Sequence, residues 1–358
     1  MYCIIMAGGS GTRFWPASRK ERPKQFLNIT GKGPMLLETC ERLRPLAREE
    51  EMILVIGREH LNEARRIFEG WRVHIIAEPA GRNTAACIGL GALYAEHLGS
   101  AGPMAFLPAD HFIADPGSFV EAVRSAGQLA ASGAIVTLGI VPTRPEIGYG
   151  YIRRDREAAG VPGGHGYGVS AFVEKPDLEK ARQYLARGDY YWNAGIFVAG
   201  AETILKEMHM HLPGLYNGLN RLRKALDNNT FETELEEVYS NLENISFDYG
   251  IMERTSSTIL VVPCECGWSD VGSWSSLYEL RKGDYDSDGN LAEGSTLLID
   301  CKGNFVSGRG GRFVACLGLK GCLIVDTPEA LLVADLKRSQ DIRKIIEHVK
   351  RDGKEDLL

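Results

Sequence analysis

The sequence predicts an α/β fold, a mostly parallel sheet with helices on both faces, followed by a small β-rich domain. Over the first two-thirds of the chain, short apolar runs alternate with helical patterns. These runs are continuously apolar, which is typical of parallel strands buried on both faces, as in a Rossmann-like sheet. After residue 283 the helical patterns give way to short strand-like runs with glycine or aspartate between them.

The elements follow in order along the chain. Strands are predicted at residues 2–6, 52–56, 73–77, 104–107 and 134–140, and helices at about 59–69, 83–98 and 118–131. Residues 149–199 are punctuated by glycine and predict an antiparallel or mixed insertion at the sheet edge, with a helix near 178–187. Residues 201–253 predict helices and 258–262 a further strand. Because ligands bind at the carboxyl ends of parallel strands, the loops after residues 6, 77 and 107 should converge on one site.

The C-terminal part predicts a small all-β unit. Residues 284–290 (DYDSDGN) form a polar linker, and the apolar runs after it recur about every eight to ten residues. This spacing is typical of a solenoid or roll, such as a left-handed β-helix, and a final helix is expected at about 337–350. We therefore predict two domains, 1–283 and 284–358, and expect the apolar tail to form a homodimer interface.

The composition limits the class of protein. The 358 residues are 44% hydrophobic and 25% charged, and a net charge of −6 does not favour nucleic-acid binding. No run approaches 18 apolar residues and the N-terminus lacks a signal-peptide pattern, so we expect a cytoplasmic protein without a membrane segment. The eight cysteines are scattered without zinc-like spacing, which predicts reduced, buried thiols.

A glycine-rich loop with a basic tail follows the first strand. Gly8, Gly9 and Gly11 expose bare backbone N–H groups, and from Arg13 to Lys24 the chain carries five basic residues against one acidic residue. The spacing matches neither a dinucleotide fingerprint nor a Walker A loop. A tight turn with a solvated basic face is one interpretation. The other is a nucleotide loop in which Arg13 and Lys24 stabilise a departing polyphosphate.

Seven ordered blocks carry a family resemblance. They are GGSGTRFWPASR with PKQF (8–26), EPAGRNTA (78–85), LPADH (107–111), FVEKP (172–176), WNAGIF (192–197), FDYGIME (247–253) and GWSDVGSW (267–274). The chain resembles the sugar-1-phosphate nucleotidylyltransferases and, among them, the guanylyltransferases that act on mannose 1-phosphate. Its sequence differs slightly from the common family motif at Phe14, where Leu is usual, and at 194–196 (AGI), where Ser-Gly-Met is usual.

The resemblance implies a reaction. Guanylyl transfer from GTP to α-D-mannose 1-phosphate would give GDP-mannose and pyrophosphate, with Mg²⁺ as cofactor and in-line attack of the sugar phosphate on the α-phosphorus. Another sugar 1-phosphate, such as a heptose, another base, or a non-catalytic GDP-mannose sensor stays open. Glycine spacing disfavours an NAD-dependent oxidoreductase. Some longer relatives carry a fused phosphomannose isomerase domain. Only about 75 residues follow the predicted boundary here, so no isomerase activity is expected.

The nucleotide-binding candidates lie in the first two blocks and the strand before them. They are Ala7, Gly8, Gly9, Gly11, Thr12, Glu78, Arg82, Asn83 and Thr84. The Glu78 carboxylate can accept hydrogen bonds from both N1–H and the N2 amino group of guanine, a donor pair that adenine lacks. A purely structural role is the alternative for Asn83, as the cap of the following helix.

The sugar-phosphate candidates come from later blocks and nearby glycines. They are Gly148, Gly150, Glu174, Lys175, Asn193 and Gly195. The resemblance implies that Lys175 meets the sugar phosphate and Glu174 the sugar hydroxyls. With Arg13 and Lys24, Lys175 completes the predicted catalytic set. Asn193 can both donate and accept, which suits a hydroxyl.

The metal candidates are Asp110 and Asp270. Mg²⁺ takes few carboxylate ligands and completes its coordination shell with water and phosphate oxygens. Two aspartates are therefore enough ligands from the protein. A helix cap is the structural alternative for each. His111 is not expected to act as a general base, because the attacking phosphate oxygen is already ionised near neutral pH.

Overall fold

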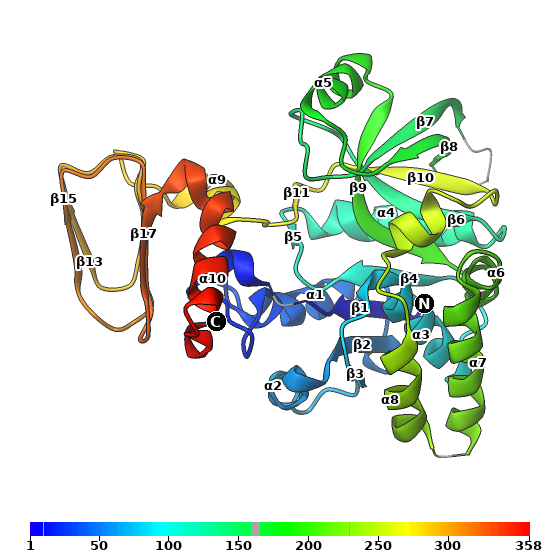
Figure 1. The fold of residues 1–358 in the computed structure, drawn as a ribbon. Coiled ribbons are helices and arrows are strands. Elements are labelled where there is room, and N and C mark those ends of the chain that lie inside the picture. The colour runs from blue at the N-terminus through cyan, green and yellow to red at the C-terminus, as the bar shows by residue number, and fades with distance from the viewer. Residues whose placement is uncertain (10, 159–164, 229) are drawn as a thin grey trace. The chain divides into compact units, whose positions relative to one another are not determined.

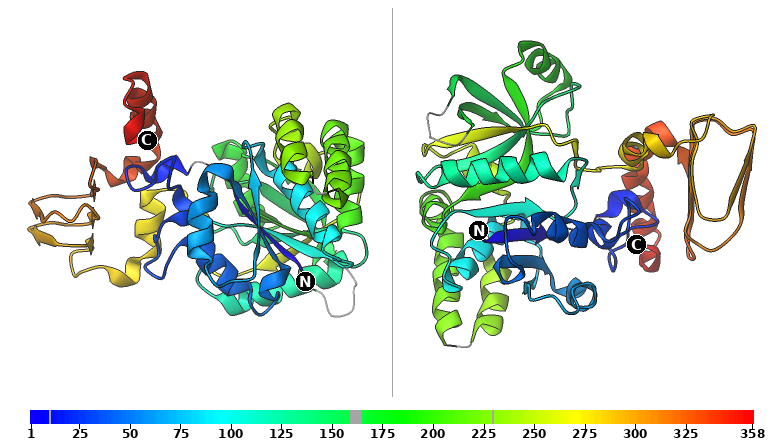
Figure 2. Two further views of the ribbon diagram at one scale, coloured as in Figure 1. Left: turned by 90° about the horizontal axis from the view of Figure 1, so that it is seen from below. Right: turned by 180° about the vertical axis from the view of Figure 1, so that it is seen from behind.

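The computed structural model describes residues 1–9, 11–158, 165–228 and 230–358. Figures 1 and 2 show the course of the chain. Packing divides the chain into two compact units. Unit 1 comprises Met1–Gly9, Leu36–Ala109 and Ile113–Trp268, and unit 2 comprises Ser10–Met35, Asp110–Phe112 and Ser269–Leu358. Among the described residues, no helix is long and apolar enough to cross a membrane.

A nine-stranded sheet forms the centre of unit 1, in the order β3-β2-β1-β4-β9-β6-β10-β8-β7. Its first part contains β1 (Cys3–Ala7), β2 (Met52–Gly57), β3 (His74–Glu78) and β4 (Met104–Pro108), all parallel. All of β1 and all but the last residue of β2 are buried. The predicted parallel sheet is therefore confirmed, and the continuous apolar runs reflect burial on both faces.

The second part of the sheet is mixed. It contains β6 (Ile135–Ile140), β7 (Tyr151–Ala158), β8 (Tyr167–Val173), β9 (Tyr190–Ala199) and β10 (Ile259–Cys264). β9 runs antiparallel between β4 and β6, while β10 is parallel to β6. The prediction placed this whole segment at the sheet edge and was wrong for β9. Its C-terminal half is apolar and buried, which suits a central position.

Helices cover both faces of this sheet, as Figure 2 shows. The helices before β10 are α1 (Met35–Leu43), α2 (Leu61–Ile67), α3 (Asn83–His97), α4 (Pro116–Ala130), α5 (Leu178–Arg187), α6 (Ala201–His211), α7 (Pro213–Asp227) and α8 (Phe231–Asn241), of which α7 packs on α3, α6 and α8. α3 is buried almost all round, since it packs against β1 and β2 as well as α6 and α7. α4 packs against β6 and β10.

Unit 2 contains a stack of short parallel strands. β12 (Leu291–Glu293), β14 (Phe305–Gly308) and β16 (Cys322–Asp326) pair in parallel, and β17 (Leu331–Asp335) adds antiparallel to β16. β13 (Thr296–Ile299) and β15 (Val314–Leu317) form a second parallel pair. The regularly spaced apolar runs are therefore successive turns of a β-helix-like stack, which confirms the predicted β-rich tail.

The tail shares a hydrophobic cluster with residues 10–35 of the same unit. Phe14 packs against Trp274 of α9 (Trp274–Leu280) at a ring-centroid distance of 5.0 Å. Trp15 Nε1 donates a hydrogen bond of 2.7 Å to the Leu357 carbonyl. A final helix, α10 (Ile342–Arg351), joins this cluster. The packing units therefore group residues 10–35 with the tail, and the domain boundary near residue 283 stays a prediction.

Two very short strands complete the list of elements. They are β5 (Phe112–Ile113) and β11 (Trp268–Ser269), at points where the chain passes from one unit to the other. The eight cysteines are all free, and only Cys322 is not fully buried. This agrees with the expectation of reduced thiols.

The contact between α3 and β1 predicts the effect of one substitution. A Cβ at Gly91 would lie 2.5 Å from Ile4 Cγ2, in the core of unit 1. Alanine favours a helix by up to about 1 kcal/mol over glycine, but the overpacking costs about 1–3 kcal/mol. Gly91→Ala should therefore lower the thermal unfolding midpoint of unit 1. Gly214→Ala on α7, where a Cβ meets nothing within 4 Å, should leave it equal or higher. An unchanged midpoint for Gly91→Ala would contradict the close packing.

Candidate functional site

The glycine loop begins where β1 ends. Ala7 is the buried last residue of the strand, and Gly8 and Gly9 are exposed immediately after it. Gly9 has a φ of 103°, a backbone conformation that favours glycine. Further along, in unit 2, Gly11 has a φ of 51°, and a Cβ there would lie 2.6 Å from the Lys24 backbone nitrogen. The glycines thus allow positive φ and a close approach to the Lys24 backbone, and the binding of a nucleotide by this loop stays a prediction.

Glu78 ends β3, two strands away from β1 in the sheet. Its Oε1 accepts a hydrogen bond of 2.9 Å from the Tyr239 hydroxyl, and a Cβ at Gly8 would lie 3.5 Å from its Oε2. Only 4% of Glu78 is exposed, and this burial raises the pKa of its carboxyl to about 7, against the lowering effect of the Tyr239 hydrogen bond. The structure therefore brings the predicted base-binding carboxylate and the start of the glycine loop together.

The predicted nucleotide-binding residues after β3, Arg82, Asn83 and Thr84, form hydrogen bonds with other groups of the protein. The Arg82 guanidinium donates to the Tyr239 and Ser240 carbonyls, at 2.7 and 2.9 Å, near the end of α8. The Thr84 hydroxyl accepts from the Phe247 N–H at 2.8 Å. Asn83 is exposed at the start of α3, where its side chain accepts from the Thr84 N–H. Their predicted contacts with a nucleotide stay predictions.

Tyr239 is a residue that the sequence reasoning missed. It lies on α8, is 1% exposed, and orients Glu78 through its hydroxyl. Arg82 holds the backbone of the same residue. In the sequence Tyr239 reads as one more apolar position on a helix beside Leu235, and only its hydroxyl, which needs a buried partner, hints at a role.

A second group of predicted residues gathers around Gly150, within unit 1. Glu174 and Lys175 follow β8, and Asn193 lies on β9. A Cβ at Gly150 would lie 2.7 Å from Glu174 Oε2 and 3.2 Å from Asn193 Cβ, so a larger residue there would displace the Glu174 side chain. The Asn193 N–H donates to the Gly150 carbonyl at 2.8 Å, while Gly195, with a φ of 63°, follows on β9. The structure thus assembles Gly150, Glu174, Asn193 and Gly195.

The other two predicted sugar-phosphate residues, Gly148 and Lys175, are exposed. Gly148 is exposed and its N–H donates to Glu146 Oε1 at 3.0 Å. The Lys175 side chain is exposed and its backbone φ is 45°. Burial, followed by the charge of the nearby Asp248, raises the pKa of Glu174 to about 7, while the Lys175 charge lowers it. A second carboxylate therefore lies near Glu174. Asp248 is therefore a second residue that the sequence reasoning missed.

In unit 2, Lys24 joins the two predicted metal ligands. Its ammonium donates to the Asp110 carbonyl at 2.8 Å, to Asp110 Oδ2 at 3.0 Å and to the Asp270 carbonyl at 2.5 Å. Burial alone would raise the pKa of Asp110, but the charges of Lys24 and His111 outweigh it and leave the pKa below its ordinary value. Lys24 thus contacts Asp110 through its carbonyl and carboxylate and Asp270 through its backbone carbonyl, and the metal site stays a prediction.

The carboxylates of Asp110 and Asp270 suit a small divalent cation whose coordination shell other ligands complete. Asp110 keeps 37% of its side chain exposed, and Asp270 Oδ1 accepts from the Gly272 N–H at 3.1 Å. No cluster of three or more histidine, cysteine or acidic side chains suited to a metal occurs in the described ranges. Two carboxylates with water and phosphate oxygens are a common Mg²⁺ shell, whereas a protein-only cage would need more ligands.

The remaining phosphate-side residues belong to the same unit. Thr12 and Arg13 lie in a short 3₁₀ turn, Thr12–Phe14, whose Phe14 is buried against Trp274. The Arg13 side chain is exposed. Its predicted contact with a departing phosphate group stays a prediction.

Backbone strain marks several of these positions. Four non-glycine residues in the described part of the chain have positive φ: Asn83, Lys175, Val271 and Asp300. The first two are predicted site residues and Val271 follows Asp270. Such conformations cost about 1–3 kcal/mol and cluster at functional sites. Asn83, Lys175 and Val271 all lie within the sequence blocks, and the functional roles of the first two stay predictions.

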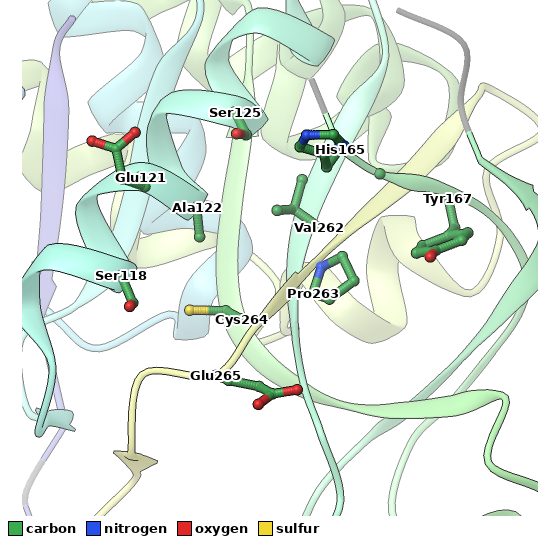
Figure 3. Close-up of a pocket in the computed structure, with 11 residues that line it drawn as sticks. Ser118, Glu121, Ala122, Ser125, His165, Tyr167, Val262, Pro263, Cys264 and Glu265 are labelled. Carbon is green, nitrogen blue, oxygen red and sulfur yellow. The ribbon is translucent and has the colours of Figure 1, made fainter. Parts of the chain in front are cut away.

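A cavity of about 640 Å³ lies elsewhere in unit 1, beside α4 and the last residues of β10. Figure 3 shows its lining, which includes Ser118, Glu121, His165, Tyr167 and Cys264. None of the predicted site residues lines it. We therefore do not assign it to the site.

Comparisons with known proteins agree with the blocks. The nucleotidyl transferase family model matches residues 2–287, and the model of the MannoseP isomerase/GMP-like beta-helix domain matches residues 294–349. A protein of Escherichia coli K12 named mannose-1-phosphate guanylyltransferase is 40% identical over 365 residues, covering 99% of this chain and 75% of its own. Mannose-1-phosphate guanylyltransferase ManC of Salmonella typhimurium LT2 is 39% identical, with coverages of 99% and 74%.

Solved structures give the same picture. A crystal structure from Thermus thermophilus, described as mannose-1-phosphate geranyltransferase, has a TM-score of 0.86 and 33% identity, and the match covers 98% of this chain and 99% of that one. A UDP-glucose pyrophosphorylase complexed with UDP-glucose has a TM-score of 0.52 and 18% identity, covering 79% of this chain and 98% of its own. The second likeness concerns the fold alone.

The Tyr239 hydrogen bond predicts a measurable shift at Glu78. Tyr239→Phe removes a donor to the charged carboxylate, so the pKa of Glu78 should rise further above its ordinary value. Stability should fall by about 1 kcal/mol. Side-chain carboxyl NMR during a pH titration measures the shift. Tyr216→Phe, at a tyrosine that packs against His209, is the control. An unchanged Glu78 titration would show that the hydroxyl does not govern this carboxylate.

Proposed function

The chain belongs to the nucleotidyl transferase family, and on this premise we propose that it transfers the guanylyl group of GTP to α-D-mannose 1-phosphate. The products would be GDP-mannose and pyrophosphate. The observation that carries the proposal is the near-complete match to relatives named mannose-1-phosphate guanylyltransferase, over 99% of this chain. The buried Glu78 beside Gly8 adds a physical reason for the choice of base.

The base would be read by Glu78. An ionised carboxylate can accept from N1–H and from the N2 amino group of guanine at once, while adenine offers no such pair. Tyr239 holds Oε1, and Arg82 holds the end of α8 that carries Tyr239. The backbone of Ala7, Gly8 and Gly9 would lie against base and ribose. A buried acceptor left without its donors penalises the wrong base strongly.

The sugar phosphate would bind at the Gly150 group. Lys175 supplies a positive charge for the phosphate, and the glycine at position 150 leaves the space that Glu174 occupies. A sugar-phosphate oxygen then attacks the α-phosphorus in line. That oxygen is ionised near neutral pH, so the protein needs to orient it and does not need a general base. Lys175 performs this orientation in our proposal.

The phosphate charge would be balanced by residues of unit 2. Nucleotidyltransferases of this type generally use a divalent metal, and we propose Mg²⁺ held by Asp110 and Asp270. When bound, the ion supplies charge neutralisation on the phosphates. Arg13 would donate hydrogen bonds to the pyrophosphate as negative charge builds on it, and Lys24, whose ammonium is bonded to Asp110 and Asp270, would contribute its positive charge. The Gly11 and Thr12 backbone would complete the phosphate contacts.

We propose a second copy of the chain as partner, through exposed apolar side chains of the β-rich stack. Large side chains there are exposed by 46–71%: Leu297, Ile299, Phe313, Leu317, Leu331 and Val333. Exposed apolar residues in such number favour burial against another subunit. Light scattering should give a dimer mass, and Leu317→Asp should lower it to the monomer. The free thiols support a cytoplasmic location.

One experiment tests the reaction. Pyrophosphate release is measured for the four nucleoside triphosphates, each with mannose, glucose and heptose 1-phosphates. GTP with mannose 1-phosphate should give the highest kcat/KM. Preference for another pair would replace the proposed substrates. Binding of GDP-mannose without turnover for any pair would favour the sensor.

Asp110→Asn is expected to abolish most turnover while the fold survives. The amide keeps an acceptor for Lys24 but loses the negative charge that a metal requires, so kcat should fall by about 100-fold or more. Asp115→Asn serves as control, because Asp115 caps α4 and asparagine caps a helix equally well. Near-normal kcat in Asp110→Asn, with unchanged thermal stability, would remove Asp110 from the metal site.

The pKa of Glu78 predicts how nucleotide use depends on pH. With a pKa of about 7, the carboxylate is ionised above neutrality and loses its charge as the pH falls. Because guanine needs the ionised form, kcat/KM for GTP should fall about fivefold between pH 7 and pH 6. Glu78→Gln should lower kcat/KM at pH 8 and flatten this dependence. Glu69→Gln, at an exposed position, should keep the wild-type profile, and the same profile in Glu78→Gln would argue against this role.

A further inference from the structure

The FDYGIME block, Phe247–Glu253, has no role in the reaction described so far. Its second residue, Asp248, begins a π-helical turn, Asp248–Met252. Asp248 Oδ1 accepts a hydrogen bond of 2.7 Å from Asn193 Nδ2. π-helical turns are rare and occur frequently at functional sites. The block therefore places a carboxylate against a residue of the proposed sugar-binding group.

Both the nitrogen and the oxygen of the Asn193 side-chain amide form hydrogen bonds within the protein. Nδ2 donates to Asp248, and Oδ1 accepts from the Gly195 N–H at 2.9 Å. The side chain is 9% exposed. The register between β6 and β9 shifts here, and Gly195 takes a φ of 63°. Such bulges re-aim side chains next to active sites. In this geometry Asn193 holds Asp248 in place, and a sugar hydroxyl has less of its amide to use than the sequence suggested.

Glu174 lies in the same group and has acceptor capacity to spare. Its Oε2 is buried without a hydrogen-bond partner in the part of the chain that the structure describes. Its backbone N–H donates to Glu253 Oε1 at 3.3 Å. Burial raises the pKa of Asp248, and the Asp248 charge helps to raise that of Glu174. Neutral hydroxyl donors would relieve this concentration of negative charge, whereas a further anion would increase it.

The block is also fastened to the start of α3. The Phe247 N–H donates to the Thr84 hydroxyl at 2.8 Å, and the Ala85 N–H donates to the Ile245 carbonyl at 3.3 Å. Asp248 is therefore anchored from two sides, by β9 through Asn193 and by α3 through the neighbouring backbone. A carboxylate fixed in this way can discriminate between hydroxyl positions, because it cannot follow a displaced hydroxyl.

We propose that Asp248 binds a ring hydroxyl of the hexose 1-phosphate and determines specificity for that hydroxyl, with Asn193 as its positioning residue. Glu174 takes a second hydroxyl beside it. This inference rests on the proposed function, since it assigns a residue to the sugar of the same reaction. It also gives Thr84 a role in supporting the sugar side of the site.

Deoxy substrates test the proposal. Asp248→Asn keeps the size of the side chain and an acceptor for Asn193, but replaces the second oxygen with a donor. kcat/KM for the sugar phosphate should fall about 10- to 100-fold, while KM for GTP and thermal stability stay unchanged. Among 2-, 3-, 4- and 6-deoxymannose 1-phosphates, one analogue should be used equally well by wild type and Asp248→Asn. That analogue lacks the hydroxyl that Asp248 binds.

A double-mutant cycle tests the role of Asn193. If Asn193 acts by holding Asp248, Asn193→Ala should lower kcat/KM for the sugar phosphate. Asp248→Asn should then lower kcat/KM by a clearly smaller factor in the Asn193→Ala variant than in the wild type. Additive effects would show that Asn193 acts on its own. Asp227→Asn, at the exposed end of α7, is the matched control and should leave all constants unchanged.

Two results would overturn the proposal. One is an equal loss of kcat/KM for every deoxy analogue in Asp248→Asn, which would indicate a general structural role. The other is a rise in KM for GTP as large as the loss on the sugar side. Failure of the proposed function is distinguishable, because wild type would then not use mannose 1-phosphate at all. The same cycle is then run with the sugar phosphate that the wild type prefers.

Discussion

The parallel register of β1, β2, β3 and β4 is the constraint on which the nucleotide side of the molecule depends. Parallel strands end at the same edge, so the glycines after β1 and Glu78 at the end of β3 come together although 70 residues separate Gly8 from Glu78. β1, β2 and β4 are buried along almost their whole length, and Glu78 at the end of β3 is buried as well. Burial removes the Glu78 carboxylate from water, which explains its raised pKa.

The predicted site residues form three parts, two in unit 1 and one in unit 2, and each surrounds its carboxylates differently. Glu78 is held by one neutral donor, Tyr239, and keeps a raised pKa. Glu174 and Asp248 lie near each other, and both have raised pKa values. Asp110 has a full positive charge beside it on Lys24, and its pKa is lowered. The pattern matches the proposed ligands, since the first two parts would receive hydrogen-bond donors and the third would receive cations and phosphate.

Much of this architecture could be predicted from the sequence. Continuous apolar runs indicated the buried parallel strands, and the glycine and lysine spacing indicated the loop. β9 could not be placed, because an apolar strand reads alike at the edge and in the centre of a sheet, and only its pairing with β4 and β6 decides. Tyr239 and Asp248 were missed for a similar reason. Each acts through one side-chain hydrogen bond to a residue far away in sequence, and no local spacing records such a bond.

The packing of the phosphate loop against the tail has a consequence for how the protein is made. Trp15 and Lys20 are tied to the backbone of Leu357 and Leu358, and Phe14 packs on Trp274. During translation these early residues would leave the ribosome long before their partners exist. The sheet of unit 1 could form on the nascent chain, but the segment carrying Arg13 and Lys24 would stay unsupported until residue 358 had emerged. The folding of this early segment would therefore wait for its contacts with Leu357 and Leu358, although most of unit 1 is synthesised between the two.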